Sequence, residues 1–385
     1  MTDTATIEPP SIYKGMGPAP ERVPEPRGNL RLPEGTVLVS ADNHWSVDDD
    51  IFYKAFPARL KDRAPRLWKT PKGGLAFSVD GVPLVPPHTY VMFENMDGVR
   101  GCSDIDARQK DLDIEGIDKE LIFANVVAAF YAYPDLEVRE WMFRAYNEHL
   151  AEMQARAPGR FYGVGLPNYW DTAQTGASME EIKKLGLKTV IIPQTPRAAD
   201  REPINYCERT MWPFWEAMEE AGLPICFHVG EVIFDGPGGC GISIFNSLGP
   251  FRKNMSELIY GGILDRHPSL RAVFVEGDIN WIPGALQTGD MIHHSYAHML
   301  DPKIKHHPRH YWENNLYATF MTDPAGLRMI DQIGADRVMW SNDYPHQESI
   351  YGCSWKSVQQ VLDAVSEDDA RKILGGNAIE LFDLR

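Results

Sequence analysis

Several common signals are missing from this sequence, and each absence excludes a class of protein. The N-terminus, "MTDTATIEPP", lacks the basic and apolar regions of a signal peptide, and no run of 18 apolar residues is present. The cysteines never occur at CxxC spacing, so we expect reduced thiols and no structural zinc knot. We therefore expect a cytoplasmic protein without a membrane span. The cysteines are Cys102, Cys207, Cys226, Cys240 and Cys353.

Basic side chains are also scarce. The chain carries 38 Lys and Arg against 54 Asp and Glu, a formal net charge of −16. Such a charge repels nucleic acid and anionic membranes, and it leaves carboxylates available for cations. The expected partner is therefore a small molecule and not a nucleic acid or a membrane.

Residues 1–35 are rich in proline, as in "PAPERVPEPRGNLRLPEG". Proline at this density prevents a helix or a central strand. We expect an extended arm that wraps the body or reaches a partner subunit, with a loose tail as the alternative. The remaining residues, 36–385, form a single predicted domain.

Eight short apolar runs alternate with amphipathic stretches along that domain, which predicts a (β/α)₈ barrel of the TIM type. A doubly wound open sheet is the alternative, but no GxGxxG follows the first strand. The predicted strands are "TVLVSA" (36–41), "KELIFAN" (119–125), "FYGVGL" (161–166), "KTVIIP" (188–193), "PICFHV" (224–229), "RAVFVE" (271–276), "LYATFM" (316–321) and "RVMWSN" (337–342).

Residues 46–118 are longer than one crossover helix requires. We interpret them as an insertion after the first strand, with a hairpin turning at Asp80-Gly81. The insertion leaves the C-terminal end of that strand, which is the catalytic face of a barrel. It is therefore a candidate lid or substrate wall, or alternatively a packing insertion.

Acidic and imidazole side chains collect where four of these strands end. One histidine after a buried strand is usually structural, but four such ends converge on one pocket in a barrel. Buried carboxylates require a partner, and a divalent metal is the simplest one. The residues are Asp42 and His44, then His228 and Glu231, then Glu276 and Asp278, and finally Asn342, Asp343 and His346.

The segments that contain these residues resemble the amidohydrolase superfamily, in the branch of the aminocarboxymuconate-semialdehyde decarboxylase-like and resorcylate decarboxylase-like proteins. The resemblance extends from about residue 36 to the C-terminus. It rests on "SADNHW", "CFHVGE", "VFVEGDINWIP", "VMWSNDYPHQES" and "ILGGNAIELF".

The resemblance implies metal ligands at Asp42, His44, His228 and Asp343, the last of which also handles a proton. At the end of the sixth strand the family usually has a histidine, and this chain has Glu276. Three carboxylates would balance most of the charge of two divalent ions. We therefore predict a dinuclear centre that includes Glu276, with iron or manganese slightly favoured over zinc.

Further polar and aromatic residues are candidates for the same pocket. His346, three residues after Asp343, is predicted to orient that aspartate, to contact substrate or to complete the metal shell. The predicted substrate-binding residues are Trp45, Asn168, Trp281 and His294. For each of these, packing is the alternative role.

The function that the sequence favours is that of a metal-dependent hydrolase. A metal-activated hydroxide would attack an ester, thioester, amide or activated C–C bond, and Asp343 would move the proton. The loss of the sixth-strand histidine favours this reading over the alternative, a non-oxidative decarboxylase of an aromatic or unsaturated acid. A non-catalytic metal-binding protein is the third hypothesis. Family habit and the Pro-rich arm predict a homodimer.

Overall fold

The computed structural model describes residues 12, 16–47, 50–69, 75–79, 82–83, 98–125, 130–131, 133–199, 201–231, 234, 236–247 and 249–385. Within these ranges, no helix is long and apolar enough to cross a membrane.

An 8-stranded parallel sheet forms the centre of the fold, in the order β1-β5-β6-β7-β8-β9-β10-β11. Each predicted strand is found, and the barrel is nearly closed because the chain after β11 bonds to β1: the Asp343 amide donates to the Asp42 carbonyl at 3.0 Å. The predicted (β/α)₈ fold is confirmed. The strands are β1 Val39–Trp45, β5 Lys119–Ala124, β6 Phe161–Gly165, β7 Thr189–Ile191, β8 Ile225–His228, β9 Ala272–Val275, β10 Leu316–Phe320 and β11 Val338–Trp340.

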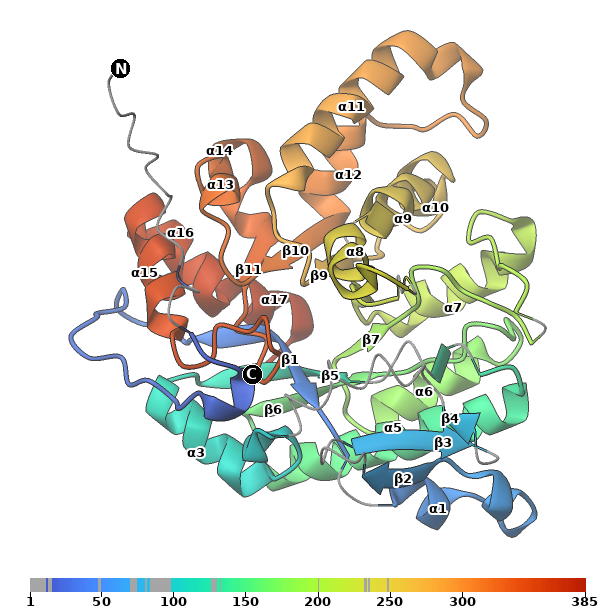
Figure 1. Ribbon diagram of the computed structural model, residues 1–385. Helices are drawn as coiled ribbons and strands as arrows, with labels where there is room; N and C mark the ends of the chain where they lie inside the picture. The colour runs from blue at the N-terminus through green and yellow to red at the C-terminus, as the bar shows by residue number, and fades with distance from the viewer. Residues whose placement is uncertain are drawn as a thin grey trace.

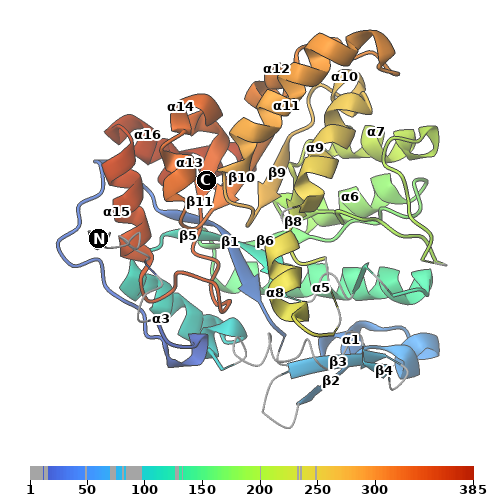
Figure 2. The same cartoon turned by 45° about the horizontal axis from the view of Figure 1, so that its top comes forward.

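Helices surround this sheet, as Figures 1 and 2 show. They bury one face against the strands, and nearly all of the buried apolar residues belong to one continuous core. The helices are α3 Ile105–Glu115, α5 Leu136–Arg156, α6 Thr175–Lys184, α7 Trp212–Ala221, α8 Gly239–Asn246, α9 Gly249–Tyr260, α10 Ile263–Arg266, α11 Trp281–Tyr296, α12 Pro308–Asn315, α13 Pro324–Leu327, α14 Ile330–Ile333, α15 Ser354–Ala364, α16 Glu367–Arg371 and α17 Asn377–Phe382.

The first strand lies later in the sequence than its apolar run predicts. It extends from Val39 through Trp45, and all seven of its residues are buried. Asp42 and His44 therefore lie inside β1 and not after it. The prediction placed the strand end too early because polar residues normally mark the surface, whereas here they line the barrel interior.

A small antiparallel sheet lies between β1 and α3 in the sequence. Its strands are β2 Arg66–Lys69, β3 Leu75–Val79 and β4 Val82–Pro83, preceded by α1 Ile51–Ala55. Val79 pairs with Val82, so β3 and β4 form a hairpin, although the predicted turn at Asp80-Gly81 lies outside the described residues. Figures 1 and 2 both show this sheet beyond the C-terminal end of β1. Its proposed role as a lid or wall remains a prediction.

Candidate metal centre

Strand β1 supplies Asp42 and His44, whose side chains enter the barrel interior, and Asn43, whose side chain is used elsewhere. The Nδ2 of Asn43 donates to Glu120 at 2.6 Å, and its Oδ1 accepts from the Ser40 hydroxyl at 2.8 Å. The alternation of a strand explains this difference, because neighbouring residues face opposite sides. Asp42 and His44 are both buried, at 0% and 2% exposure.

His228 ends strand β8 and faces the same point. Its Nε2 lies 3.2 Å from Asp42 Oδ1 and 3.6 Å from Glu276 Oε2. Its Nδ1 donates to the Val229 carbonyl at 2.9 Å. This hydrogen bond keeps a proton on Nδ1, so Nε2, which lies within hydrogen-bond distance of the Asp42 carboxylate, is the ring nitrogen that a metal ion would bind.

Glu276 and Asp343 follow strands β9 and β11 and share an unusual backbone conformation. Their φ angles are 63° and 57°, in the left-handed region that costs a non-glycine residue about 1–3 kcal/mol. Hydrogen bonds hold both turns: the Glu276 amide donates to Thr319 Oγ1 at 2.8 Å, and the Asp343 amide donates to Asp42. The turns direct both carboxylates back into the barrel mouth.

These side chains bring their ligand atoms together in two overlapping groups, and within each group all of the atoms lie within 4.8 Å of one another. One group is Asp42, His44, His228 and Glu276, and the other is His44, Glu276, Asp343 and His346. The structure thus brings together all of the predicted ligands. It also places His346 in the second group, a residue for which the sequence allowed several roles.

Several polar atoms at the centre of the cluster have no hydrogen-bond partner although they are buried. They are Asp42 Oδ2, both ring nitrogens of His44 and both carboxylate oxygens of Asp343, of which Oδ2 has an ion-pair contact with His346 Nδ1 at 3.2 Å but no hydrogen bond. His44 Nε2 lies 3.1 Å from Asp343 Oδ1, but the two do not form a hydrogen bond. Unpaired buried donors and acceptors are costly, and a divalent cation bound between them would satisfy the set. The residues present therefore fit a metal ion.

The electrostatics of the cluster are also compatible with a cation. Burial raises the pKa of Glu276 well above its usual range, and the nearby Asp343 carboxylate raises it further. Burial likewise raises the pKa of Asp343, although His346 opposes this shift. For His44, burial and then the neighbouring His346 and His228 hold the pKa well below its usual range, so the ring is neutral. A neutral imidazole beside crowded carboxylates is the protonation state that metal binding requires.

His346 contacts both the cluster and Asn125, the residue directly after strand β5. Its Nδ1 lies 3.2 Å from Asp343 Oδ2, and its Nε2 lies 3.0 Å from Asn125 Oδ1. Burial opposes protonation of this ring, but the Asp343 carboxylate outweighs it and raises the pKa of His346 to about 9. This geometry suits a group that orients Asp343.

The predicted substrate-binding residues occupy different places. Trp45 is buried on the outer side of β1, where its Nε1 donates to His149 Nε2 at 2.9 Å. Asn168 donates to Glu140 at 2.7 Å. Trp281, at the start of α11, donates to the Asp278 carbonyl at 3.1 Å. His294 is exposed on α11. None of the four belongs to the two ligand groups, and their binding role remains a prediction.

One functional feature was missed by sequence reasoning, namely a buried ion pair beneath β1. Arg108 Nε and Glu120 Oε1 lie 2.7 Å apart, with both side chains at most 1% exposed. Arg108 also donates to the His44 carbonyl at 2.9 Å. The pair therefore holds both Asn43 and His44 in place. A glutamate inside the apolar strand "KELIFAN" was the available signal.

Comparisons with known proteins agree with this geometry. A family model described as amidohydrolase matches residues 56–384. A gamma-resorcylate decarboxylase from Polaromonas sp. is 27% identical over 304 residues, covering 72% of this chain and 87% of that protein. A 2-amino-3-carboxymuconate-6-semialdehyde decarboxylase from Dictyostelium discoideum is 22% identical over 299 residues, covering 74% and 77%.

A solved structure shares the fold. The 5-carboxyvanillate decarboxylase of Novosphingobium aromaticivorans, complexed with manganese and 4-hydroxy-3-methoxy-5-nitrobenzoic acid, aligns with a TM-score of 0.70. The alignment covers 94% of this chain and 99% of that one, at 19% identity.

Proposed function

This chain belongs to the amidohydrolase family, and on that premise we propose that it is a metal-dependent, non-oxidative decarboxylase of an aromatic or unsaturated carboxylic acid. The observation that carries the proposal is the buried cluster formed by the two ligand groups, in which the unpaired atoms of Asp42, His44 and Asp343 fit one divalent cation. The decarboxylases among the relatives supply the type of reaction.

The hydrolase predicted from the sequence is therefore corrected. The relatives are decarboxylases of gamma-resorcylate and of a carboxymuconate semialdehyde, which matches the alternative reaction. The prediction relied on Glu276 in place of a histidine. That substitution does not select hydrolysis, because one metal and its ligands polarise either substrate, and the bond that breaks depends on the groups the substrate presents. Ester, thioester and amide cleavage are no longer proposed.

The proposed cofactor is a divalent cation held by Asp42, His44, His228 and Asp343. Bound there, it would supply Lewis-acid polarisation of the substrate's oxygens. Manganese accompanies the Novosphingobium protein, and an oxygen-rich ligand set also accepts iron. The second ion, and Glu276 as its ligand, remain predictions, because one cation already accounts for the unpaired atoms.

The remaining side chains of the cluster have roles in moving a proton. Decarboxylation breaks the bond between a carbon and its carboxylate, CO₂ leaves, and the electron pair left on the carbon takes up a proton. Glu276 belongs to both ligand groups and His346 to one of them, and each carries a group that can hold a proton. We assign proton delivery to Glu276, since Asp343 and Asn125 already hold both ring nitrogens of His346.

The experiment measures CO₂. Manganese-loaded protein is incubated with salicylate-, resorcylate- and vanillate-type acids, and with an ester and thioester panel. We expect CO₂ and the proton-substituted product from at least one acid. Release of acid from the esters without CO₂ from any carboxylate would overturn the proposal.

Two variants at position 276 separate a proton donor from a ligand. Glu276→His keeps a proton-carrying group, so we expect it to retain activity, whereas Glu276→Gln loses at least about a hundredfold, the usual contribution of acid catalysis. Metal content should stay at one ion per chain in both. Loss of metal in Glu276→Gln would instead make Glu276 a ligand. His306→Ala, at an exposed position between α11 and α12, is the matched control.

The homodimer and the cytoplasmic location are further proposals that this assay does not address. Sedimentation of the metal-loaded protein would measure the first directly. A monomer at micromolar concentration would rule it out.

A further inference from the structure

A second, small hydrophobic cluster lies apart from the main core and connects the N-terminal arm to the metal centre. It consists of Ala19, Val99, Tyr344 and Tyr351. Ala19 is completely buried, although it lies in the Pro-rich arm. Tyr344 and Tyr351 belong to residues 344–353, which follow Asp343 and which we call the His346 loop. Figures 1 and 2 show the arm running beside α15, which begins directly after this loop.

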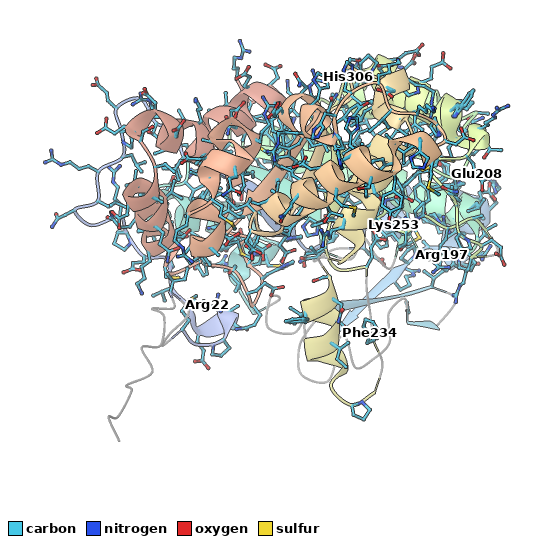
Figure 3. All side chains as sticks on the ribbon, turned by 90° about the horizontal axis from the view of Figure 1, so that it is seen from above. Arg22, Arg197, Glu208, Phe234, Lys253 and His306 are labelled. Carbon is cyan, nitrogen blue, oxygen red and sulfur yellow. The ribbon has the colours of Figure 1, made fainter. Side chains whose placement is uncertain are left out.

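Arg22 makes the most specific contacts between the arm and the loop. Its guanidinium donates to the Gln347 carbonyl at 2.5 Å and to the Ser349 carbonyl at 2.8 Å. It also donates to the Ser349 hydroxyl at 3.2 Å and, through Nε, to the arm's own Gly17 carbonyl at 3.0 Å. Hydrogen bonds from a charged donor are about twice as strong as neutral ones. Figure 3 shows Arg22 at the edge of the body, beside the η1 turn Ala19–Glu21.

Two further contacts close the arm over the loop. The Ala19 amide donates to Gln347 Oε1 at 3.0 Å. Farther along, Glu115 Oε1 accepts from the Glu25 amide of the arm at 3.3 Å and from the Gly352 amide of the loop at 2.6 Å. The arm is thus bound directly to the middle of the loop, and Glu115 links it to Gly352 near the end of the loop.

The loop has little regular structure of its own between Pro345 and Ser349, yet it must hold His346 beside Asp343. Arg22 binds the carbonyls of Gln347 and Ser349, which lie shortly after His346 in the loop. Fixing these carbonyls restricts the backbone of His346 and Glu348, and thereby the direction of the His346 ring. The length and direction of the Asp343 contact depend on that ring.

We propose that residues 17–25 of the arm act as a clamp on the His346 loop, and that Arg22 is a positioning residue for His346. The effect on catalysis rests on the proposed function. The clamp itself does not, because it concerns loop order and metal affinity, which are measured without a substrate.

The test compares Arg22→Ala and Arg22→Gln with Arg27→Ala. Arg27 lies in the same arm, but its guanidinium lies over the ring of Trp355, 5.8 Å from the ring centroid. Amide hydrogen exchange over residues 344–353 and the affinity for Mn²⁺ alone are measured in the full chain. We expect exchange at least about tenfold faster and Mn²⁺ binding about three- to tenfold weaker in both Arg22 variants. Arg27→Ala should match the wild type in both.

Arg22→Lys provides the rescue. A lysine keeps the charge but cannot bind two carbonyls with a planar fork, so we expect exchange between the two extremes. Exchange and Mn²⁺ affinity in Arg22→Ala equal to those of Arg27→Ala would overturn the clamp. If neither the wild type nor any variant releases CO₂, the proposed function fails. Amide exchange and Mn²⁺ affinity still show whether the clamp exists.

Discussion

The imidazole rings of His44 and His346 lie stacked, with centroids 3.7 Å apart and ring planes within 15°. One ring comes from the first strand of the barrel and the other from the loop after the last, so this contact joins the two sides of the site where the barrel closes. Burial and the proximity of His346 keep the pKa of His44 low. Burial first, and then the electrostatic effect of the adjacent His346, therefore keep His44 neutral, in the form that can bind a metal.

Replacement of His346 should weaken the metal site without unfolding the protein. In His346→Ala, Asp343 loses its 3.2 Å contact and His44 loses its stacking partner. Partners of metal ligands typically contribute 10–100-fold to metal affinity, so we expect a loss of about that size. Calorimetric titration with Mn²⁺ measures it, with His306→Ala as the exposed control. An unchanged affinity would contradict this role for His346.

Removal of the metal should lower thermal stability. The metal-free centre holds crowded buried carboxylates, and a cation bound only by the folded state stabilises it by about 2.7 kcal/mol at 100 times the dissociation constant. We expect a chelator to lower the Tm and Mn²⁺ to restore it, measured by scanning calorimetry. Asp42→Asn/His44→Ala protein should show no chelator effect. An equal Tm with and without chelator would argue against a bound cation.

The buried Arg108–Glu120 pair should be essential for stability. Glu120→Gln leaves the Arg108 charge without its partner, and breaking a buried pair costs about 3–5 kcal/mol. Urea unfolding measures the change. Arg100→Ala is the control, because the Arg100–Asp104 pair, at 83% and 31% exposure, should contribute at most about 1 kcal/mol. Similar losses in both variants would contradict the proposed support beneath β1.

Glu115 should make stability depend on pH. Burial raises its pKa from 4.5 to about 7, although hydrogen bonds from Ser354 and Gly352 oppose the shift. The titratable groups that face it, Tyr351 and Cys353, have raised pKa values themselves and stay neutral. The folded state therefore holds a proton between about pH 4.5 and 7 that the unfolded state releases.

The sign follows from that difference. The contribution of the Glu115 proton to the free energy of unfolding is complete below about pH 4.5. It is lost as the pH rises to about 7, which lowers the free energy of unfolding by up to about 3 kcal/mol. Glu115→Gln should flatten the dependence over that range. Urea unfolding at several pH values provides the measurement, and a wild-type slope identical to that of the variant would contradict it.

The sequence by itself determined the barrel and the chemistry of its mouth. Strands such as "PICFHV" and "RAVFVE" are recognisable because apolar runs bounded by polar residues are local patterns, and His228 and Glu276 follow from the ends of those runs. Because strand ends converge in a barrel, the sequence also predicts that these carboxylates and imidazoles lie close together.

Only the tertiary structure decided how those residues are held. The left-handed turns at Glu276 and Asp343, the Arg108–Glu120 pair beneath Asn43 and the contacts of Arg22 with the His346 loop all join distant parts of the chain. Arg22 and Ser349 are 327 residues apart in sequence, and no local pattern reports a contact of that kind. The apolar periodicity of the chain specifies which elements form. Whether a polar atom inside the barrel is paired depends on contacts between distant parts of the chain, so it can be determined only from the tertiary structure.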